Sequence, residues 1–315
     1  MIPVRSGQRA VARVASMAAA ALVAGSLVTT LSGGAAHAAA VGATTPFTSY
    51  EAEAGVLGGG AAVVSLTAAP TTRYSSPQLE ASGHAYVQLT GTGQSVTWTN
   101  NTGQPVSFVN LRVSMPDTAG GGGTTSSINL YVNGAFRQAL PVNSRQTWLY
   151  ENSNNSNYNQ SSQNPSDGNA RVAWDDTHAF LSGTAVPAGG TITIQKDAAN
   201  SAANYLVDVI DVENPPAPIA QPANSLSITS CGAVADNAVT NGAADSGATD
   251  STAAIQNCIT QAQSQGKILW IPQGTFYLKG TQGLRAQGIT IEGAGMWYSR
   301  IYRAVPLPNG QPLAA

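Results

Sequence analysis

The stretch Asp250-Ser251-Thr252-Ala253-Ala254-Ile255-Gln256-Asn257-Cys258-Ile259 decides how the last part of the chain folds. Apolar residues recur here at spacings of three and four, with polar residues between them; the apolar positions are Ile255, Cys258, Ile259 and Ala262. This pattern predicts one amphipathic helix. Asp250 can accept hydrogen bonds from the amides of its first turn, and Gly266 can close its last turn in a left-handed conformation.

Short apolar runs follow this helix. They cover 267–271, 275–278 and 288–295, and glycines and the turn Pro272-Gln273-Gly274 separate them. Runs of this length bounded by glycine and proline predict short strands. One helix followed by several short strands indicates a solenoid with a helical lid.

Four ordered blocks in this region resemble the entry segment of pectate-lyase-like right-handed parallel β-helix enzymes. They are Ser230-Cys231-Gly232-Ala233-Val234, Asp250-Ser251-Thr252-Ala253-Ala254-Ile255, Trp270-Ile271-Pro272-Gln273-Gly274-Thr275-Phe276 and Ile291-Glu292-Gly293-Ala294-Gly295. The resemblance implies that the helix covers the open apolar end of the first coil, where strand edges and core would otherwise be exposed. It covers about the last quarter of the chain and specifies a fold but no reaction.

Composition indicates a β-rich extracellular protein of about two domains. Only 10% of the 315 residues are charged, 33 are glycine, and no basic patch exists, which argues against a nucleic-acid partner. Residues 1–38 carry three arginines ahead of an Ala/Val/Leu-rich run that ends in Ala36-His37-Ala38, as in a secretory signal peptide. A membrane anchor is the alternative, but the run is mostly alanine and is interrupted by polar residues. We therefore expect a secreted, extracellular protein with no membrane association after cleavage.

Cleavage after Ala38 would remove the three arginines and take the formal charge from −2 to −5. This balance favours neutral or weakly polar partners. The two cysteines, Cys231 and Cys258, would meet an oxidising compartment, where a disulfide could connect the entering strand to the lid helix. Two buried free thiols are the alternative.

Residues 47–213 show short alternating runs separated by Gly, Asn, Ser and Pro, which predicts an all-β sandwich. Asn133-Gly134 predicts a type I′ hairpin turn. The runs expected to form strands are 48–53, 61–66, 85–89, 95–99, 108–115, 127–132, 135–140, 171–174, 191–195 and 205–212.

The same residues resemble carbohydrate-binding modules of the family 6 and family 35 type, which are β-jelly rolls. The segments that carry the resemblance are Tyr50-Glu51-Ala52-Glu53-Ala54, Ser82-Gly83 with Tyr86-Val87, Val113-Ser114-Met115, Leu130-Tyr131-Val132-Asn133-Gly134, Trp148, Pro187-Ala188-Gly189 and Asp208-Val209-Ile210. Such a module joined to a lidded β-helix resembles the secreted family 87 type of α-1,3-glucanase, or mycodextranase. The expected fold is therefore a β-jelly-roll sandwich at 47–213, a Pro-rich linker at 214–225, and the capped start of a right-handed parallel β-helix at 226–315.

Three acidic residues could hold a cation. Glu51 and Glu53 are two apart on a predicted strand, so their carboxylates would point to the same side and repel each other. Asp208 shares a predicted face with Leu206 and Ile210, where an isolated carboxylate is costly to bury. The first and last strands of a jelly roll can be neighbours, so the three could converge on Ca²⁺, and the related modules hold a structural calcium at these positions. Solvated glutamates and an amide-bonded aspartate are the alternative.

Sugar binding requires flat aromatic faces and hydrogen-bonding side chains. The candidate aromatic residues are Trp148, Tyr150, Tyr158, Trp174 and Tyr205, and the candidate polar residues are Asn204, Asp175 and Asp176. Burial in the core is an equal alternative for Trp148 and Tyr205, because alternating strand patterns predict it as well. The run Trp174-Asp175-Asp176-Thr177-His178 departs from the aromatic, Asp, Glu and Arg run of the related modules, so it does not fix a ligand assignment.

No catalytic residue is assigned. Glycoside hydrolysis needs two carboxylates at a defined separation, and the acids after the linker are Asp236, Asp245, Asp250 and Glu292, with Asp250 best explained as a helix cap. The related enzymes place their acids on middle coils, so the chain is expected to be an incomplete, polysaccharide-binding part of a glycoside hydrolase, and a monomer. A stand-alone glycan-binding protein and part of a pectate-lyase-like enzyme are the alternatives.

Overall fold

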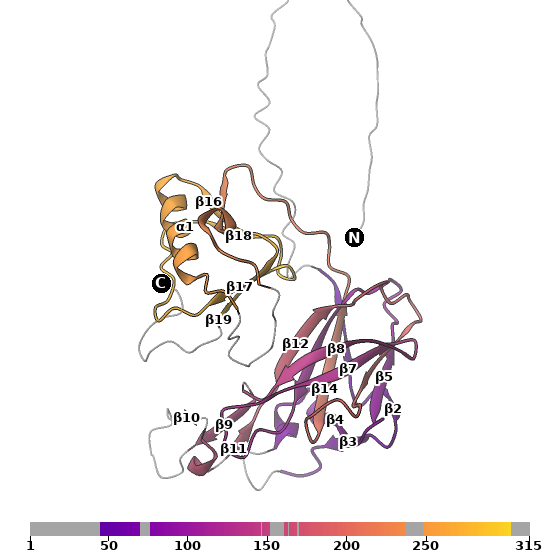
Figure 1. Cartoon of the computed structure of the whole chain (residues 1–315). Coiled ribbons are helices and arrows are strands. Elements are labelled where there is room, and N and C mark those ends of the chain that lie inside the picture. The colour runs from indigo at the N-terminus through magenta and orange to yellow at the C-terminus, as the bar shows by residue number, and fades with distance from the viewer. Residues whose placement is uncertain are drawn as a thin grey trace, which may run out of the picture. The chain divides into compact units, whose positions relative to one another are not determined.

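The structure is a computed structural model, and it describes residues 45–69, 76–145, 147–151, 161–162, 164–168, 170–236 and 248–303. The predicted signal peptide at 1–38 lies outside these residues. Strand is the main regular structure of the described residues, which agrees with the all-β prediction (Figure 1).

Two large antiparallel sheets contain most of the strands between Phe47 and Glu213. One has the strand order β12-β6-β14-β4-β3, with β1 also paired to β14, and the other has the order β2-β5-β13-β7-β8. The strands of the first are β1 (Phe47–Glu51), β3 (Ala62–Ser65), β4 (Ala85–Leu89), β6 (Phe108–Ser114), β12 (Asp175–Phe180) and β14 (Tyr205–Glu213). Those of the second are β2 (Val56–Gly58), β5 (Ser95–Thr99), β7 (Thr125–Val132), β8 (Ala135–Asn143) and β13 (Thr191–Gln195).

Shorter elements join these sheets. A small sheet has the order β10-β9-β11. Its strands are β9 (Trp148–Glu151), β10 (Ser161–Ser162) and β11 (Ala170–Val172), and the 3-10 turns in this part are η1 (Pro77–Leu79), η2 (Ser82–His84) and η3 (Pro165–Asp167).

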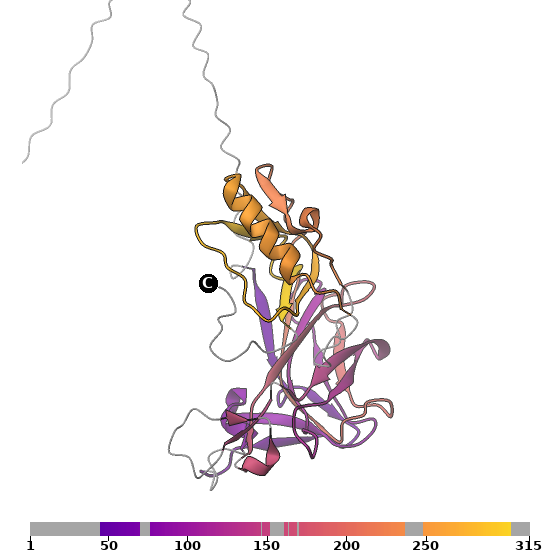
Figure 2. The same ribbon diagram turned by 60° about the vertical axis from the view of Figure 1, so that its left-hand side comes forward.

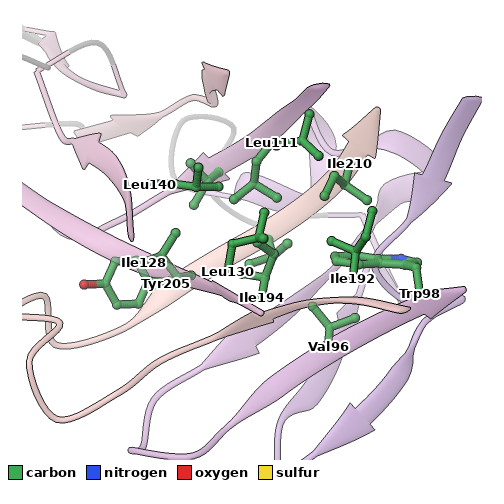
Figure 3. Close-up of a cluster of buried hydrophobic side chains, with 14 of the residues drawn as sticks. Val96, Trp98, Leu111, Ile128, Leu130, Leu140, Ile192, Ile194, Tyr205 and Ile210 are labelled. Atoms are coloured by element: carbon green, nitrogen blue, oxygen red, sulfur yellow. The ribbon is translucent and has the colours of Figure 1, made fainter. Parts of the chain in front are cut away.

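A single apolar core fills the space between the two large sheets. Figure 3 shows side chains from both sheets meeting there, among them Ile128, Leu130 and Ile194 from one and Leu111 and Ile210 from the other. Alternate residues of each strand point inward, which is the period-2 pattern that predicted the sandwich. The turn between β7 and β8 has positive φ at both Asn133 (50°) and Gly134 (77°), so the predicted type I′ hairpin is confirmed.

An irregularity in β14 alters one predicted face. The register of β14 against β6 shifts between Val207 and Ile210. Leu206 packs with Ala81 and Tyr86 in a second, smaller apolar cluster, whereas Ile210 packs in the main core. The expectation that Leu206 and Ile210 share a face with Asp208 is therefore wrong, because the extra residue of a bulge breaks the alternation.

The last part contains parallel strands. β15 (Ser225–Ser227), β16 (Ile268–Ile271) and β18 (Ile291–Gly293) form one parallel sheet, and β17 (Gly274–Leu278) pairs in parallel with β19 (Ser299–Arg303). The segment 214–224 before β15 contains no strand or helix, and the amide of Ile219 in it donates to the carbonyl of Ala294 at 2.9 Å.

Helix α1 (Thr252–Ser264) packs on this parallel part, and Figure 2 shows its full length. The predicted apolar positions Ile255, Cys258, Ile259 and Ala262 are all buried. The carboxylate of Asp250 accepts from the amide of Thr252 at 3.0 Å, and Gly266 has φ 62°, so both predicted end signals are confirmed. This 13-residue helix is too short to cross a membrane. No other helix among the described residues is long and apolar enough to do so.

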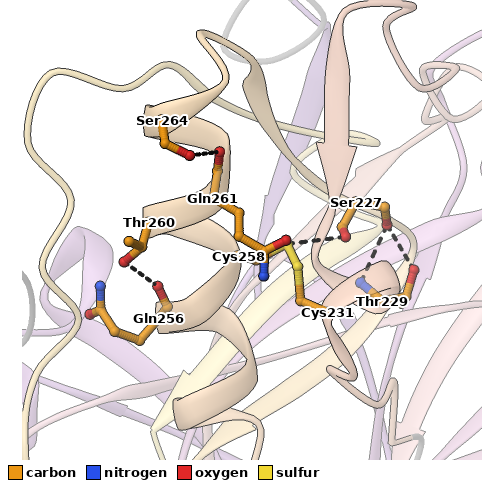
Figure 4. The surroundings of a disulfide bond; sticks show 8 residues. All are labelled: Ser227, Thr229, Cys231, Gln256, Cys258, Thr260, Gln261 and Ser264. Carbon is orange, nitrogen blue, oxygen red and sulfur yellow. Dashed lines mark hydrogen bonds between the residues drawn. A yellow bond between two sulfur atoms is a disulfide. The ribbon is translucent and has the colours of Figure 1, made fainter.

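The disulfide between Cys231 and Cys258 is present, with Cα atoms 5.5 Å apart (Figure 4). Cys258 is on the buried face of α1. Cys231 ends the 3-10 turn η4 (Ile228–Cys231), so its predicted position in a strand is wrong. The turn places the Cys231 side chain beside the helix and ties the two elements together.

Candidate functional site

The acidic residues predicted to hold a cation come from two neighbouring strands. Glu51 ends β1, and its Cα partner on β14 is Val209, next to Asp208. Glu53 lies in the turn after β1, so its predicted position on the strand is wrong. The turn nevertheless leaves Glu53 close enough to Glu51 and Asp208 for their charges to interact.

Ser82 and Arg112 contact these carboxylates. The amide of Ser82 donates to Asp208 Oδ1 at 3.0 Å, and its hydroxyl donates to Glu51 Oε1 at 2.7 Å. Arg112 Nε lies 3.3 Å from Asp208 Oδ2, and the Asp208 side chain is fully buried. One arginine thus offsets part of the charge of three neighbouring carboxylates.

Burial has the largest effect on the pKa of Asp208 and of Glu53. It raises the pKa of Asp208 to about 6, although the Ser82 amide and Arg112 act in the opposite direction and the charges of Glu51 and Glu53 add to the rise. Burial also raises the pKa of Glu53, and the charge of Glu51 contributes to that rise. The Oε2 atoms of Glu51 and Glu53 are buried and have no hydrogen-bond partner among the described residues. Two unpartnered carboxylate oxygens fit a cation ligand set.

Gly83 makes room for the Glu53 carboxylate. It has φ 59°, and a Cβ atom there would lie 2.8 Å from Glu53 Oε1. Within the described ranges, no three His, Cys, Asp or Glu side chains lie close enough together to hold a metal ion by themselves. A cation here would therefore need Glu51 and Glu53 together with oxygens of another kind, with Asp208 as a charged neighbour already bonded to Arg112.

Trp174 lies beside Arg112. Its ring centroid is 6.0 Å from the Arg112 guanidinium carbon and 5.6 Å from the ring of Tyr86, and its Nε1 donates to the carbonyl of Pro77 at 3.2 Å. The side chain is half-buried. One part of the indole is thus fixed by packing while another part remains accessible to a ligand.

Trp148 and Tyr150 lie together on β9. Their rings stack at 6.4 Å; Trp148 Nε1 donates to the carbonyl of Met115 at 2.8 Å, and the Tyr150 hydroxyl donates to Asp117 at 3.0 Å. Tyr150 is buried, and burial together with the Asp117 carboxylate raises its pKa to about 12. Both rings help to order the loop that contains Asp117.

The remaining predicted ligand residues do not converge on one point. Asp175 accepts from Asn143 at 3.2 Å, and burial raises its pKa, whereas Asp176 is exposed and accepts from Asn110 at 3.3 Å. Tyr205 is 0% exposed in the core, so its ring offers no surface to a sugar in this structure. Asn204, which precedes it, is half-buried, and Tyr158 lies outside the described residues.

Arg112 was not among the predicted site residues, although a charged residue between the apolar neighbours Leu111 and Val113 on β6 was a usable signal. Two of the acids in the last part, Asp250 and Asp236, have structural partners. Burial works against the charged form of Asp250, but hydrogen bonds from Thr252 and Lys279 outweigh it and lower its pKa. Asp236 accepts from the amide of Thr249, Glu292 lies on β18, and Asp245 lies outside the described residues.

Two parts of the chain match known protein families. Residues 44–215 match the family model described as "Alpha-1,3-glucanase catalytic domain D1", and residues 235–310 match "Rhamnogalacturonase A/epimerase, pectate lyase-like". The chain is thus related to polysaccharide-degrading glycoside hydrolases. Because the first match covers more than half of its length, the chain belongs to the α-1,3-glucanase family that has catalytic domain D1.

Solved structures agree with this family. The Agl-KA catalytic domain is 34% identical with a TM-score of 0.71, and the match covers 85% of this chain and 44% of that one. The catalytic unit of the thermostable GH87 α-1,3-glucanase from Streptomyces thermodiastaticus strain HF3-3 is 30% identical with a TM-score of 0.59, over 82% of this chain and 40% of that one. A GH87 α-1,3-glucanase catalytic domain solved with tetrasaccharides is 25% identical with a TM-score of 0.59, over 82% and 41%. The chain thus spans less than half the length of these relatives. No curated protein sequence matched it.

Proposed function

We propose that this chain is the glycan-binding part of a secreted α-1,3-glucanase of the glycoside hydrolase class. The observation that carries the proposal is the match of residues 44–215 to the α-1,3-glucanase domain, together with the 34% identity to the Agl-KA catalytic domain over 85% of this chain. Related domains have been solved with nigerose and with tetrasaccharides, which makes an α-glucan the first ligand to test.

The two folded parts have separate roles in this proposal. The antiparallel sandwich is a β-jelly roll that binds the polysaccharide, as the resemblance to carbohydrate-binding modules implies. The parallel pairing of β16 with β15 and β18, with α1 packed on the same apolar cluster, supports the proposal that the last part is the capped start of a right-handed β-helix. A secretory signal at 1–38 and a monomeric state remain part of the proposal.

Binding to insoluble glycans tests this function. The 315-residue chain should sediment with α-1,3-glucan, and Trp174→Ala should bind more weakly because it removes the accessible part of the indole. Trp174→Phe is the matched control, since it keeps an aromatic face. If both Trp174→Ala and Tyr158→Ala remain folded and bind as well as the parent, the predicted aromatic residues are not the binding site.

A second candidate function follows from the pectate lyase-like match at 235–310. On this alternative the chain is part of a pectin-active enzyme, and pectin should retain it better than α-1,3-glucan does. Retention by pectin alone would reject the glucanase proposal.

We also propose that Glu51 and Glu53 bind Ca²⁺ beside Asp208. The buried, unpartnered Oε2 atoms of both glutamates support this, because hard oxygen ligands are what Ca²⁺ takes in proteins. A ligand that binds only the folded state, at a free concentration of about 100 times its Kd, stabilises the folded state by about 2.7 kcal/mol. Melting in calcium and then in chelator tests the site, and an identical Tm in both would reject it.

A further inference from the structure

The outward face of the five-stranded sheet holds a group of side chains that none of the sites above uses. Strand register places Tyr131 between Thr193 and Phe136, and it places Asn129 beside Gln195. Their chain neighbours Leu130 and Ile194 point into the core, so these side chains face away from it.

Phe136 is the aromatic anchor of this face. It is 57% exposed, and its ring meets Tyr131 edge to face with centroids 5.7 Å apart. The next residue, Arg137, donates to the carbonyls of Ser182 and Thr184, which fixes the hairpin that carries Phe136. An exposed ring on a fixed hairpin contributes nothing to the core, but it loses little conformational entropy on binding a ligand.

Asp197 organises the polar side chains beside these rings. Its carboxylate accepts from Asn129, Tyr131 and Gln195, and these three bonds outweigh burial and lower its pKa. Asn200 accepts from the Asp197 amide at 2.6 Å and donates to the Asn129 side chain at 3.2 Å. The amides and the carboxylate therefore have fixed orientations before any ligand arrives.

We propose that the sheet face formed by Asn129, Tyr131, Phe136, Gln195 and Asp197 is a second glycan-binding site that takes a neutral glucan chain. The Phe136 ring offers a flat surface to the C–H face of a sugar, and the oriented amides and carboxylate offer partners to its hydroxyls. The Asp197 carboxylate already accepts three hydrogen bonds from neighbouring side chains. This face therefore does not require a cationic partner.

This proposal rests on the proposed function, and the test separates the two. Adsorption of the full 315-residue chain to insoluble α-1,3-glucan should weaken about three- to tenfold in Phe136→Ala, whereas Phe136→Tyr should keep the parent affinity. Gln195→Ala, which removes an amide without touching the hairpin, should also weaken adsorption. Phe47→Ala is the matched control, because Phe47 is 61% exposed on β1 of the other large sheet and should be neutral.

Three outcomes would overturn the proposal. If Phe136→Ala and Gln195→Ala adsorb like the parent while Trp174→Ala does not, the function stands and this site is wrong. If the parent adsorbs to no glucan, both proposals are wrong. If Phe136→Ala leaves adsorption intact but converts a dimer to a monomer in sedimentation, the face is a protein interface.

Discussion

Replacing Asp208 by asparagine should stabilise the calcium-free protein at neutral pH. The Asp208 side chain is fully buried, and burial raises its pKa to about 6 from an ordinary value of 3.8. The charged form is therefore less favourable in the folded state than in the unfolded state, even with Arg112 beside it. The difference corresponds to about 3 kcal/mol of unfolding free energy above pH 6.

The sign of the pH dependence follows from which state binds the proton more tightly. Between pH 3.8 and 6 the folded protein holds the Asp208 proton and the unfolded chain loses it, so stability falls as pH rises through this window. Asparagine cannot titrate. Asp208→Asn should therefore match the parent near pH 3.5 and exceed it by up to about 3 kcal/mol at pH 8 in chelator.

Urea unfolding followed by circular dichroism at pH 3.5, 5, 6.5 and 8 measures this difference. Asp211→Asn is the control, because Asp211 lies on the same strand, is not fully buried and accepts from Ser49 at 2.6 Å. Calcium should stabilise the parent more than Asp208→Asn, since a bound cation favours the charged carboxylate. If Asp208→Asn is less stable than the parent at pH 8 in chelator, the buried carboxylate is not a destabilising charge.

Three further predictions concern the same structure. Gly83→Ala should lower the unfolding free energy by at least ~1 kcal/mol in urea unfolding, and by more than Gly103→Ala, because both glycines have positive φ but only a Cβ at Gly83 would meet another side chain. If both variants lose the same unfolding free energy, the Glu53 side chain moves aside at no cost. Replacing Cys231 and Cys258 by serine should lower the unfolding free energy by about 3 to 4 kcal/mol through the lost loop constraint, and an unchanged urea midpoint would contradict this. The 315-residue polypeptide should release no reducing sugar from α-1,3-glucan, dextran or pectin, because Asp236 and Asp250 bond backbone amides; turnover abolished by Glu292→Gln or Asp245→Asn would contradict this.

The alternating apolar pattern was sufficient to locate most of the sandwich. Each of the ten predicted strands corresponds to a strand of the structure, with ends that differ by up to three residues. The short strands β2, β9 and β10 were not predicted, and the longer β12 was missed because Asp175, Asp176 and His178 do not form an apolar alternation. Pairing with β6 holds it in place, which is a tertiary effect that local sequence does not encode.

The candidate site was less predictable than the fold. The periodicity of the sequence fits a buried ring and an exposed ring for Tyr205 equally well. In the structure the Tyr205 ring is buried in the main core. Nor could it locate the bulge that separates the face of Leu206 from that of Ile210. Arg112 reaches Asp208 from a neighbouring strand, a contact that depends on strand order.

Adsorption isotherms for the 315-residue chain on insoluble α-1,3-glucan, β-1,3-glucan and pectin, measured side by side in calcium, test whether this protein binds α-1,3-glucan selectively. We expect saturable adsorption to α-1,3-glucan that soluble nigerose or longer α-1,3-linked oligosaccharides displace. Equal adsorption to all three polymers, or adsorption to pectin alone, would contradict it.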